Sequence, residues 1–68
     1  MSVVKVIELM AESSTSWEDA TKSAVIQASK TVADILSVYV QDMSTTVKDG
    51  KVDKFRVNVK ISFAIKNS

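Results

Sequence analysis

From Phe55 to Ile65, hydrophobic residues occupy every odd position of the chain, and polar residues occupy every even position except Ala64. A period of two is typical of a β-strand that has one face in the core and the other in contact with water or a ligand. The pattern therefore predicts a long strand over residues 52–66. Its polar face is net basic and consists of Lys54, Arg56, Asn58, Lys60, Ser62 and Lys66.

Two shorter stretches also favour strands. The first, residues 3–10, has hydrophobic residues on both parities, so both of its faces are expected to be at least partly covered. In the second, which begins at Leu36, hydrophobic residues alternate with Ser, Tyr and Gln. The pair Asp49-Gly50 is a turn signal that joins this strand to the long one, and residues 45–47 either extend the strand or begin a longer loop.

Between the first two strands, helical spacing of hydrophobic residues predicts a helix over about residues 14–32. Thr15 and Glu18 fit a capping box at its start, and Ser13 is an equally suitable cap. Ile26 falls on the outer face of this helix, where it is a candidate contact between copies of the chain. The inner stripe consists of Trp17, Ala20, Ala24, Ala28 and Ile35, widened by Val25 and Val32.

These elements predict one α+β domain over residues 1–68, with the order β-α-β-β. In a wholly antiparallel sheet, the first and second strands run in the same direction, so the third strand must lie between them. The prediction is thus a three-stranded antiparallel sheet of order 1-3-2, with the helix packed on the odd-numbered face of the third strand. A single helix leaves the other face uncovered, and that face would present Ser37, Tyr39, Arg56, Asn58 and Lys60.

The 68 residues contain no cysteine and no histidine, which excludes disulfides and a zinc cluster. A chain this short removes only about 60% of its unfolded surface from water, so self-association is the expected source of further stability. Nine basic and eight acidic residues give a net charge of +1, which does not indicate a nucleic-acid partner. No hydrophobic run approaches the roughly 20 residues that span a bilayer. We expect a cytoplasmic protein with no membrane partner.

Candidate chemistry favours binding over catalysis. Without cysteine or histidine, the serines have no usual general base, and phosphate-binding loops are absent, so we predict no enzyme. Arg56, the only arginine, suits bidentate contact with phosphate or carboxylate. The alternative is a structural salt bridge with Glu8, Asp42 or Asp53. Acidic side chains could supply oxygen ligands for Ca²⁺ or Mg²⁺ if several strands or subunits contribute, and Glu8 and Asp42 are the metal candidates.

Three segments resemble the dodecin family. They are Val-Lys-Val-Ile-Glu-Leu from Val4, Ser-Thr-Ser-Trp-Glu-Asp-Ala from Ser14, and Val-Asn-Val-Lys-Ile-Ser-Phe-Ala-Ile from Val57. Their order and spacing and the total length extend the resemblance over essentially the whole chain. The resemblance implies a curved β-α-β-β sheet around one helix and a hollow homododecamer. It also implies flavin storage at subunit interfaces, as in many members.

The chain departs from that family where flavin binds. Flavin-binding dodecins have a stacking Trp at the position of Ser37 and a ring-binding Gln at the position of Arg56. These substitutions predict weak binding of FMN, FAD or riboflavin, because a stacking ring and a hydrogen-bond acceptor are both lost. The resemblance is closer to dodecins that lack the Trp and are described as calcium-binding. If the geometry is conserved, Ser37 and Arg56 border an interface pocket that is wider, wetter and more cationic.

The sequence therefore leaves two classes of function open, a shell that binds a guest and a purely structural assembly. The basic residues Lys54, Arg56 and Lys60 favour an anionic guest such as a phosphate-bearing cofactor, with Tyr39 and Asn58 as further ligand candidates. If these bases only neutralise acids on neighbouring subunits, the shell is a purely structural assembly.

Overall fold

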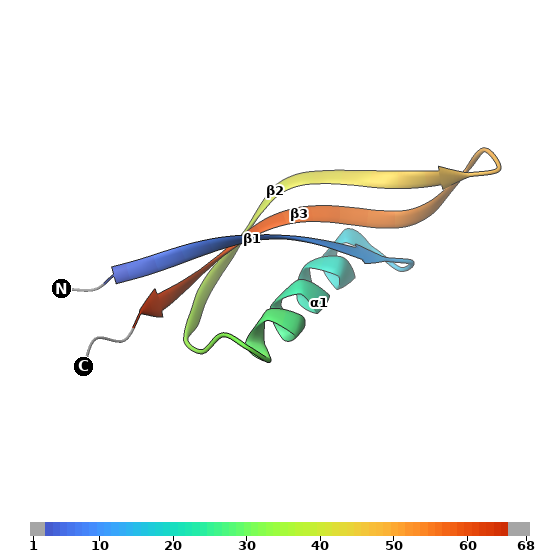
Figure 1. Ribbon diagram of the computed structural model, residues 1–68. Helices are drawn as coiled ribbons and strands as arrows, with labels where there is room; N and C mark the ends of the chain where they lie inside the picture. The colour runs from blue at the N-terminus through green and yellow to red at the C-terminus, as the bar shows by residue number, and fades with distance from the viewer. Residues whose placement is uncertain (1–2, 66–68) are drawn as a thin grey trace.

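The computed structural model describes residues 3–65, which form one helix and three strands. The strands make a single antiparallel sheet of order β1-β3-β2, and α1 lies against one side of it (Figure 1). This confirms the predicted α+β class, the β-α-β-β order and the strand order 1-3-2. No helix in the described range is long and apolar enough to cross a membrane. The elements are β1 (Val3–Ser13), α1 (Trp17–Ser29), β2 (Ile35–Lys48) and β3 (Lys51–Ile65).

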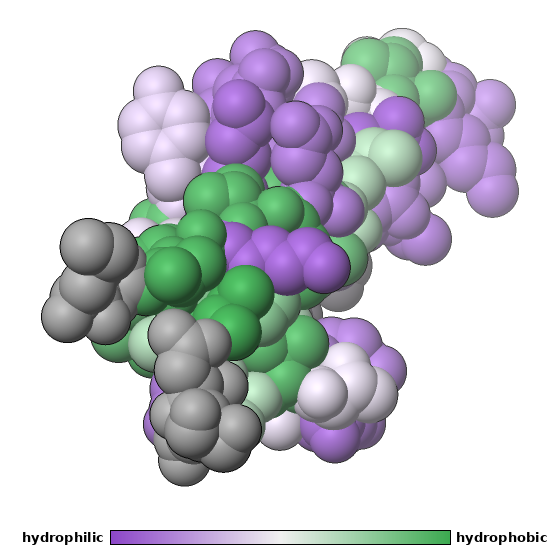
Figure 2. Space-filling model, turned by 60° about the vertical axis from the view of Figure 1, so that its left-hand side comes forward, coloured by the Kyte–Doolittle hydropathy of each residue, from purple (hydrophilic) through white to green (hydrophobic). Residues whose placement is uncertain are grey.

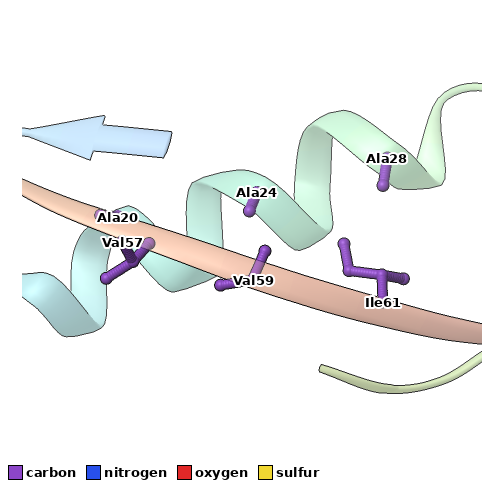
Figure 3. Close-up of a cluster of buried hydrophobic side chains, with 6 residues drawn as sticks. All are labelled: Ala20, Ala24, Ala28, Val57, Val59 and Ile61. Atoms are coloured by element: carbon purple, nitrogen blue, oxygen red, sulfur yellow. The ribbon is translucent and has the colours of Figure 1, made fainter. Parts of the chain in front are cut away.

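The core lies between α1 and the odd-numbered face of β3. Val57, Val59 and Ile61 are at most 1% exposed, as the alternating pattern predicts. They pack against three buried alanines one helical turn apart, which Figure 3 shows directed toward the strand. A methyl side chain lets the helix approach the sheet closely, so the small residues of α1 match the larger residues of β3. The alanines are Ala20, Ala24 and Ala28.

The helix is shorter at its start than predicted, and both predicted caps are wrong. Ser16 is the N-cap, and its hydroxyl accepts a hydrogen bond of 3.0 Å from the Asp19 amide. Ser13 instead ends β1, where its hydroxyl accepts from the Thr15 amide and donates to the Asp19 carboxylate. Because β1 continues to Ser13 rather than ending near Met10, the chain turns over residues 14–16 before a helix can begin.

The helix also ends earlier than residue 32. After Ser29, the amides of Thr31 and Val32 both donate to the Ala28 carbonyl oxygen, which closes the last turn. Ile35, which helical spacing placed on the inner stripe of α1, is the first residue of β2 and packs against the core from there. The hydrophobic residues that follow α1 keep helical spacing as far as Ile35, although the helix has already ended, and this made the predicted helix too long.

The β2–β3 hairpin is long and closes as predicted. Residues 45–47 extend β2 and do not form a loop. Asp49 and Gly50 both have positive φ, 53° and 75°, which is the backbone twist that two-residue hairpin turns require. The predicted end of the third strand at residue 66 lies outside the described residues.

Much hydrophobic surface stays open in the single chain, which is 53 Å long. In β1 only the face toward α1 is covered, since Ile7, Leu9 and Ala11 pack against the core while Val6 and Met10 are exposed. The expectation that both faces of this strand are covered is therefore wrong for a single copy. Figure 2 shows hydrophobic side chains gathered at the end that holds both chain termini. The hairpin exposes others, namely Met43, Val47 and Val52.

Candidate functional site

The candidate site lies on the side of the sheet that faces away from α1, here called the open face. The three strands bring its residues into rows, since residues paired across strands point to the same side. One row holds Glu8, Lys60 and Tyr39. The next holds Met10, Asn58 and Asp42, and a third holds Glu12, Arg56 and Ser44.

Arg56 forms an ion pair across the sheet with Glu12 of β1. Its Nε donates to Glu12 Oε2 over 2.8 Å, and its Nη2 donates to the same oxygen. The hydrogen bonding from Arg56 lowers the pKa of Glu12 below its ordinary value of 4.5, and the positive charges of Arg56 and Lys54 add to this effect, while burial opposes it. A structural salt bridge was one of the two predictions for Arg56, but its partner is none of the three acids considered.

Sequence reasoning missed Glu12 because it ended the first strand near Met10. The signal was present, since Glu12 has the same parity as Glu8 and would face the third strand if the first strand extended that far. Lys60 is held more loosely, with its Nζ 4.0 Å from Glu8 Oε1. Arg56 and Lys60 are thus paired with acids of their own chain, so the open face is far less cationic than the sequence of β3 alone predicts.

A hollow of about 250 Å³ lies between these two ion pairs on the open face. The register of β2 against β3 shifts between Val40 and Asp42, so that Gln41 and Asp42 occupy the space of one residue. Such a bulge directs an additional side chain at one place on a sheet. The hollow is lined by Glu8, Leu9, Met10, Gln41, Asp42, Asn58 and Val59.

The hollow brings together both predicted metal candidates, Glu8 and Asp42, and the ligand candidate Asn58. Among residues 3–65, the Asp42 carboxylate has neither an ion-pair nor a hydrogen-bond partner. Within the same range, however, no group of three or more acidic, histidine or cysteine side chains is placed to hold a metal ion. One copy of the chain therefore offers two carboxylates and two side-chain amides at this place.

The two residues matched to the flavin site lie far apart in one copy. Ser37 is opposite Ser62, and their hydroxyls are hydrogen-bonded to each other. Arg56 is six positions away from Ser62 on β3, which is about 20 Å along a strand. Both belong to the open face, but one chain does not bring them into one pocket. Tyr39 lies next to Lys60 with its ring exposed.

Comparison with known proteins agrees with this architecture. Residues 3–66 match the sequence profile of the Dodecin family. The calcium dodecin of Mycobacterium tuberculosis is 35% identical over 66 residues, which cover 97% of this chain and 93% of that protein. The chain therefore belongs to the dodecin family, as the resemblance implied.

Solved structures of dodecins have the same fold. The structure of the Mycobacterium tuberculosis calcium dodecin, described as calcium-chelating with a novel calcium-binding site, matches with a TM-score of 0.83 and 36% identity. That match covers 97% of this chain and 94% of the other. A dodecin from Streptomyces coelicolor matches with a TM-score of 0.93 and 25% identity, covering 98% and 96% of the two chains.

Proposed function

We propose that this chain assembles into a homododecameric hollow shell that binds or stores a small molecule or an ion and catalyses no reaction. The observation that carries the proposal is the uncovered side of the sheet. The single helix covers one side only, and on the open face the large hydrophobic residues Val6 and Met10 are 53% and 59% exposed. Burial of such surface against other copies is favourable at roughly 25 cal/mol per Å². Family membership supports the same assembly, and a cytoplasmic location is part of the proposal.

The assembly is tested by native mass spectrometry and analytical ultracentrifugation at micromolar protomer concentration. A particle of twelve subunits is expected. A stable monomer or dimer at that concentration would contradict the proposal.

For the guest, the charge balance around the hollow favours a cation. Arg56 and Lys60 are paired with acids of β1, which leaves Asp42, unpaired among residues 3–65, as the excess charge beside the hollow. Calcium prefers six to eight oxygen ligands, including carboxylates, amide carbonyls and water. The hollow offers such oxygens from Glu8, Asp42 and Asn58, and water or another copy would complete the shell. The relative named calcium dodecin supports the same ion.

Equilibrium dialysis of the assembled protein against Ca²⁺, Mg²⁺, riboflavin, FMN and coenzyme A separates the candidate guests. We expect Ca²⁺ to bind and the flavins and coenzyme A to bind weakly. Binding of none of these would favour the alternative, a purely structural assembly without a specific guest.

A matched pair of variants then tests the hollow. Asp42→Asn removes one charge from it and should abolish Ca²⁺ binding. Asp53→Asn removes the same charge from β3 outside the residues that line the hollow, so it should bind Ca²⁺ like the unmodified protein. Equal loss in both variants would show that net charge, and not this hollow, attracts the ion.

A further inference from the structure

The Arg56 guanidinium presents to Glu12 the edge that proteins use to recognise oxoanions. Its Nε and Nη2 donors point in parallel, and such a pair matches a carboxylate or phosphate group. In this chain both donors converge on one oxygen, Glu12 Oε2. The side chains of Arg56 and Glu12 remain 38% and 34% exposed, so the pair is accessible to a dissolved guest in the single chain.

Two residues of β2 with hydroxyl side chains lie in the rows at and next to Arg56 on the open face. Ser44 lies opposite Arg56 in the register, and Thr46 lies opposite Lys54. The Thr46 hydroxyl oxygen accepts a hydrogen bond from the Lys54 amide, so its own proton remains to donate to another group. Glu12 is the acid within this group, and the next carboxylate, Asp42, lies in the adjacent row.

We propose that Glu12 is a specificity-determining residue, because its carboxylate occupies the oxoanion site at Arg56 as a built-in ligand and thereby excludes guests that carry a phosphate or carboxylate. The proposed role of Glu12 rests on the proposed guest-binding function, and it explains why the protein would select against anionic guests. A carboxylate of the same chain competes at an effective concentration of about millimolar or more, which a dilute guest must overcome. The charges of Glu12, Arg56 and Lys54 add to +1, and removal of the Glu12 charge raises this sum to +2.

The test is Glu12→Gln, which keeps the shape of the side chain and removes its charge. Asp34→Asn is the control, since it removes one acidic charge at the other end of the sheet: Asp34 precedes Ile35, which pairs with Phe63, and Phe63 is seven positions from Arg56, about 23 Å along β3. Isothermal titration calorimetry of the assembled variants with inorganic phosphate and with FMN measures the gain in affinity. Riboflavin, which lacks the phosphate, separates binding of the phosphate from binding of the ring.

We expect Glu12→Gln to bind phosphate and FMN at least about tenfold more tightly than the parent, with no gain for riboflavin. Asp34→Asn should stay within about twofold, because charges more than a Debye length of about 8 Å away are largely screened at physiological salt. The double variant Glu12→Gln/Arg56→Gln should return to the parent affinity. No gain in affinity in Glu12→Gln, or an equal gain in Asp34→Asn, would overturn the inference.

A second measurement covers the case in which Glu12→Gln fails to assemble. Arg56 is the only arginine, so its side-chain Nε–H group gives a single NMR signal. This signal should remain unchanged when phosphate is added to the unmodified protein and should shift in Glu12→Asp, whose shorter side chain holds Arg56 less well. A shift of the same size in the unmodified protein would refute the built-in ligand. Subunit number and Ca²⁺ binding of the unmodified protein test the proposed function separately.

Discussion

The indole Nε1–H of Trp17 donates a hydrogen bond of 2.9 Å to the backbone carbonyl oxygen of Ser44. This contact joins the first turn of α1 to β2. The same indole meets the Phe55 ring of β3 edge-on, with centroids 5.0 Å apart and an angle of 76° between the planes. Trp17, the first residue of α1, therefore links three elements, and Figure 1 shows the β2–β3 hairpin extending past the helix.

Replacement of Trp17 by Phe should cost about 1 kcal/mol of stability, because the hydrogen bond to Ser44 is lost while an aromatic ring remains against Phe55. Urea unfolding at one fixed protomer concentration measures the loss. Tyr39→Phe serves as control, since the Tyr39 ring is exposed, and should change stability by less than about 0.5 kcal/mol. Equal stability of Trp17→Phe and the parent would contradict the structural role.

Replacement of Ala24 by Leu should destabilise the fold by about 1–3 kcal/mol, because the position is 3% exposed and faces the β3 side chains without free space for three more carbons. Ile26→Leu, on the outer face of the same helix, should be nearly neutral. Thermal unfolding of the two variants at equal concentration provides the comparison. A neutral Ala24→Leu would mean that the helix does not lie so close to the sheet.

The Glu12–Arg56 pair should make stability depend on acid pH. The folded-state pKa of Glu12 lies below its ordinary value of 4.5, so the folded protein prefers the charged form. Its contribution is fully present well above pH 4.5 and is lost as the pH falls through that value toward the lowered pKa. Urea midpoints between pH 3 and pH 7 should therefore fall less steeply for Glu12→Gln than for the parent. Parallel pH profiles would rule out this pair as the source.

If Ca²⁺ binds in the hollow, it should stabilise the folded protein. A ligand that binds only the folded state contributes about 2.7 kcal/mol at a concentration 100 times its dissociation constant. The melting temperature should rise with added Ca²⁺ and return after addition of a chelator. Asp42→Asn should melt at the same temperature with and without the ion. Stabilisation of that variant would place the ion elsewhere.

Flavin should bind weakly to the unmodified protein and keep most of its fluorescence, because Ser37 offers no aromatic ring to stack on the flavin. The double change Ser37→Trp/Arg56→Gln should restore tight binding with quenched fluorescence. The added ring contributes about 0.5–1.5 kcal/mol beyond the apolar area that it buries. Fluorescence titration with riboflavin and FMN measures both effects. Tight, quenched binding by the unmodified protein would show that the residue matching is wrong.

The hollow and both ion pairs of the open face escaped sequence reasoning for one reason. Each depends on which residue of one strand lies opposite which residue of another, and residues 44 positions apart, such as Glu12 and Arg56, carry no local sign of their pairing. The sequence does not identify the bulge at Gln41 either. The alternating pattern of β2 breaks there, but a break alone does not distinguish a bulge from the end of a strand. Glu8 and Asp42 are predicted as metal candidates and Asn58 as a ligand candidate, and only the register places all three at one hollow.

The sequence by itself determined the elements, their order and the buried face of β3, because a period of two and a helical stripe of alanines are local patterns that hydrophobic burial enforces directly. The turn at Asp49-Gly50 was also readable, since few residue pairs accept two consecutive positive φ values. Only the tertiary structure decided that β1 continues to Ser13, that Ser16 caps the helix, and that the Glu12 carboxylate pairs with the Arg56 guanidinium. Those features follow from how far strands pair, and strand pairing is a contact between distant parts of the chain.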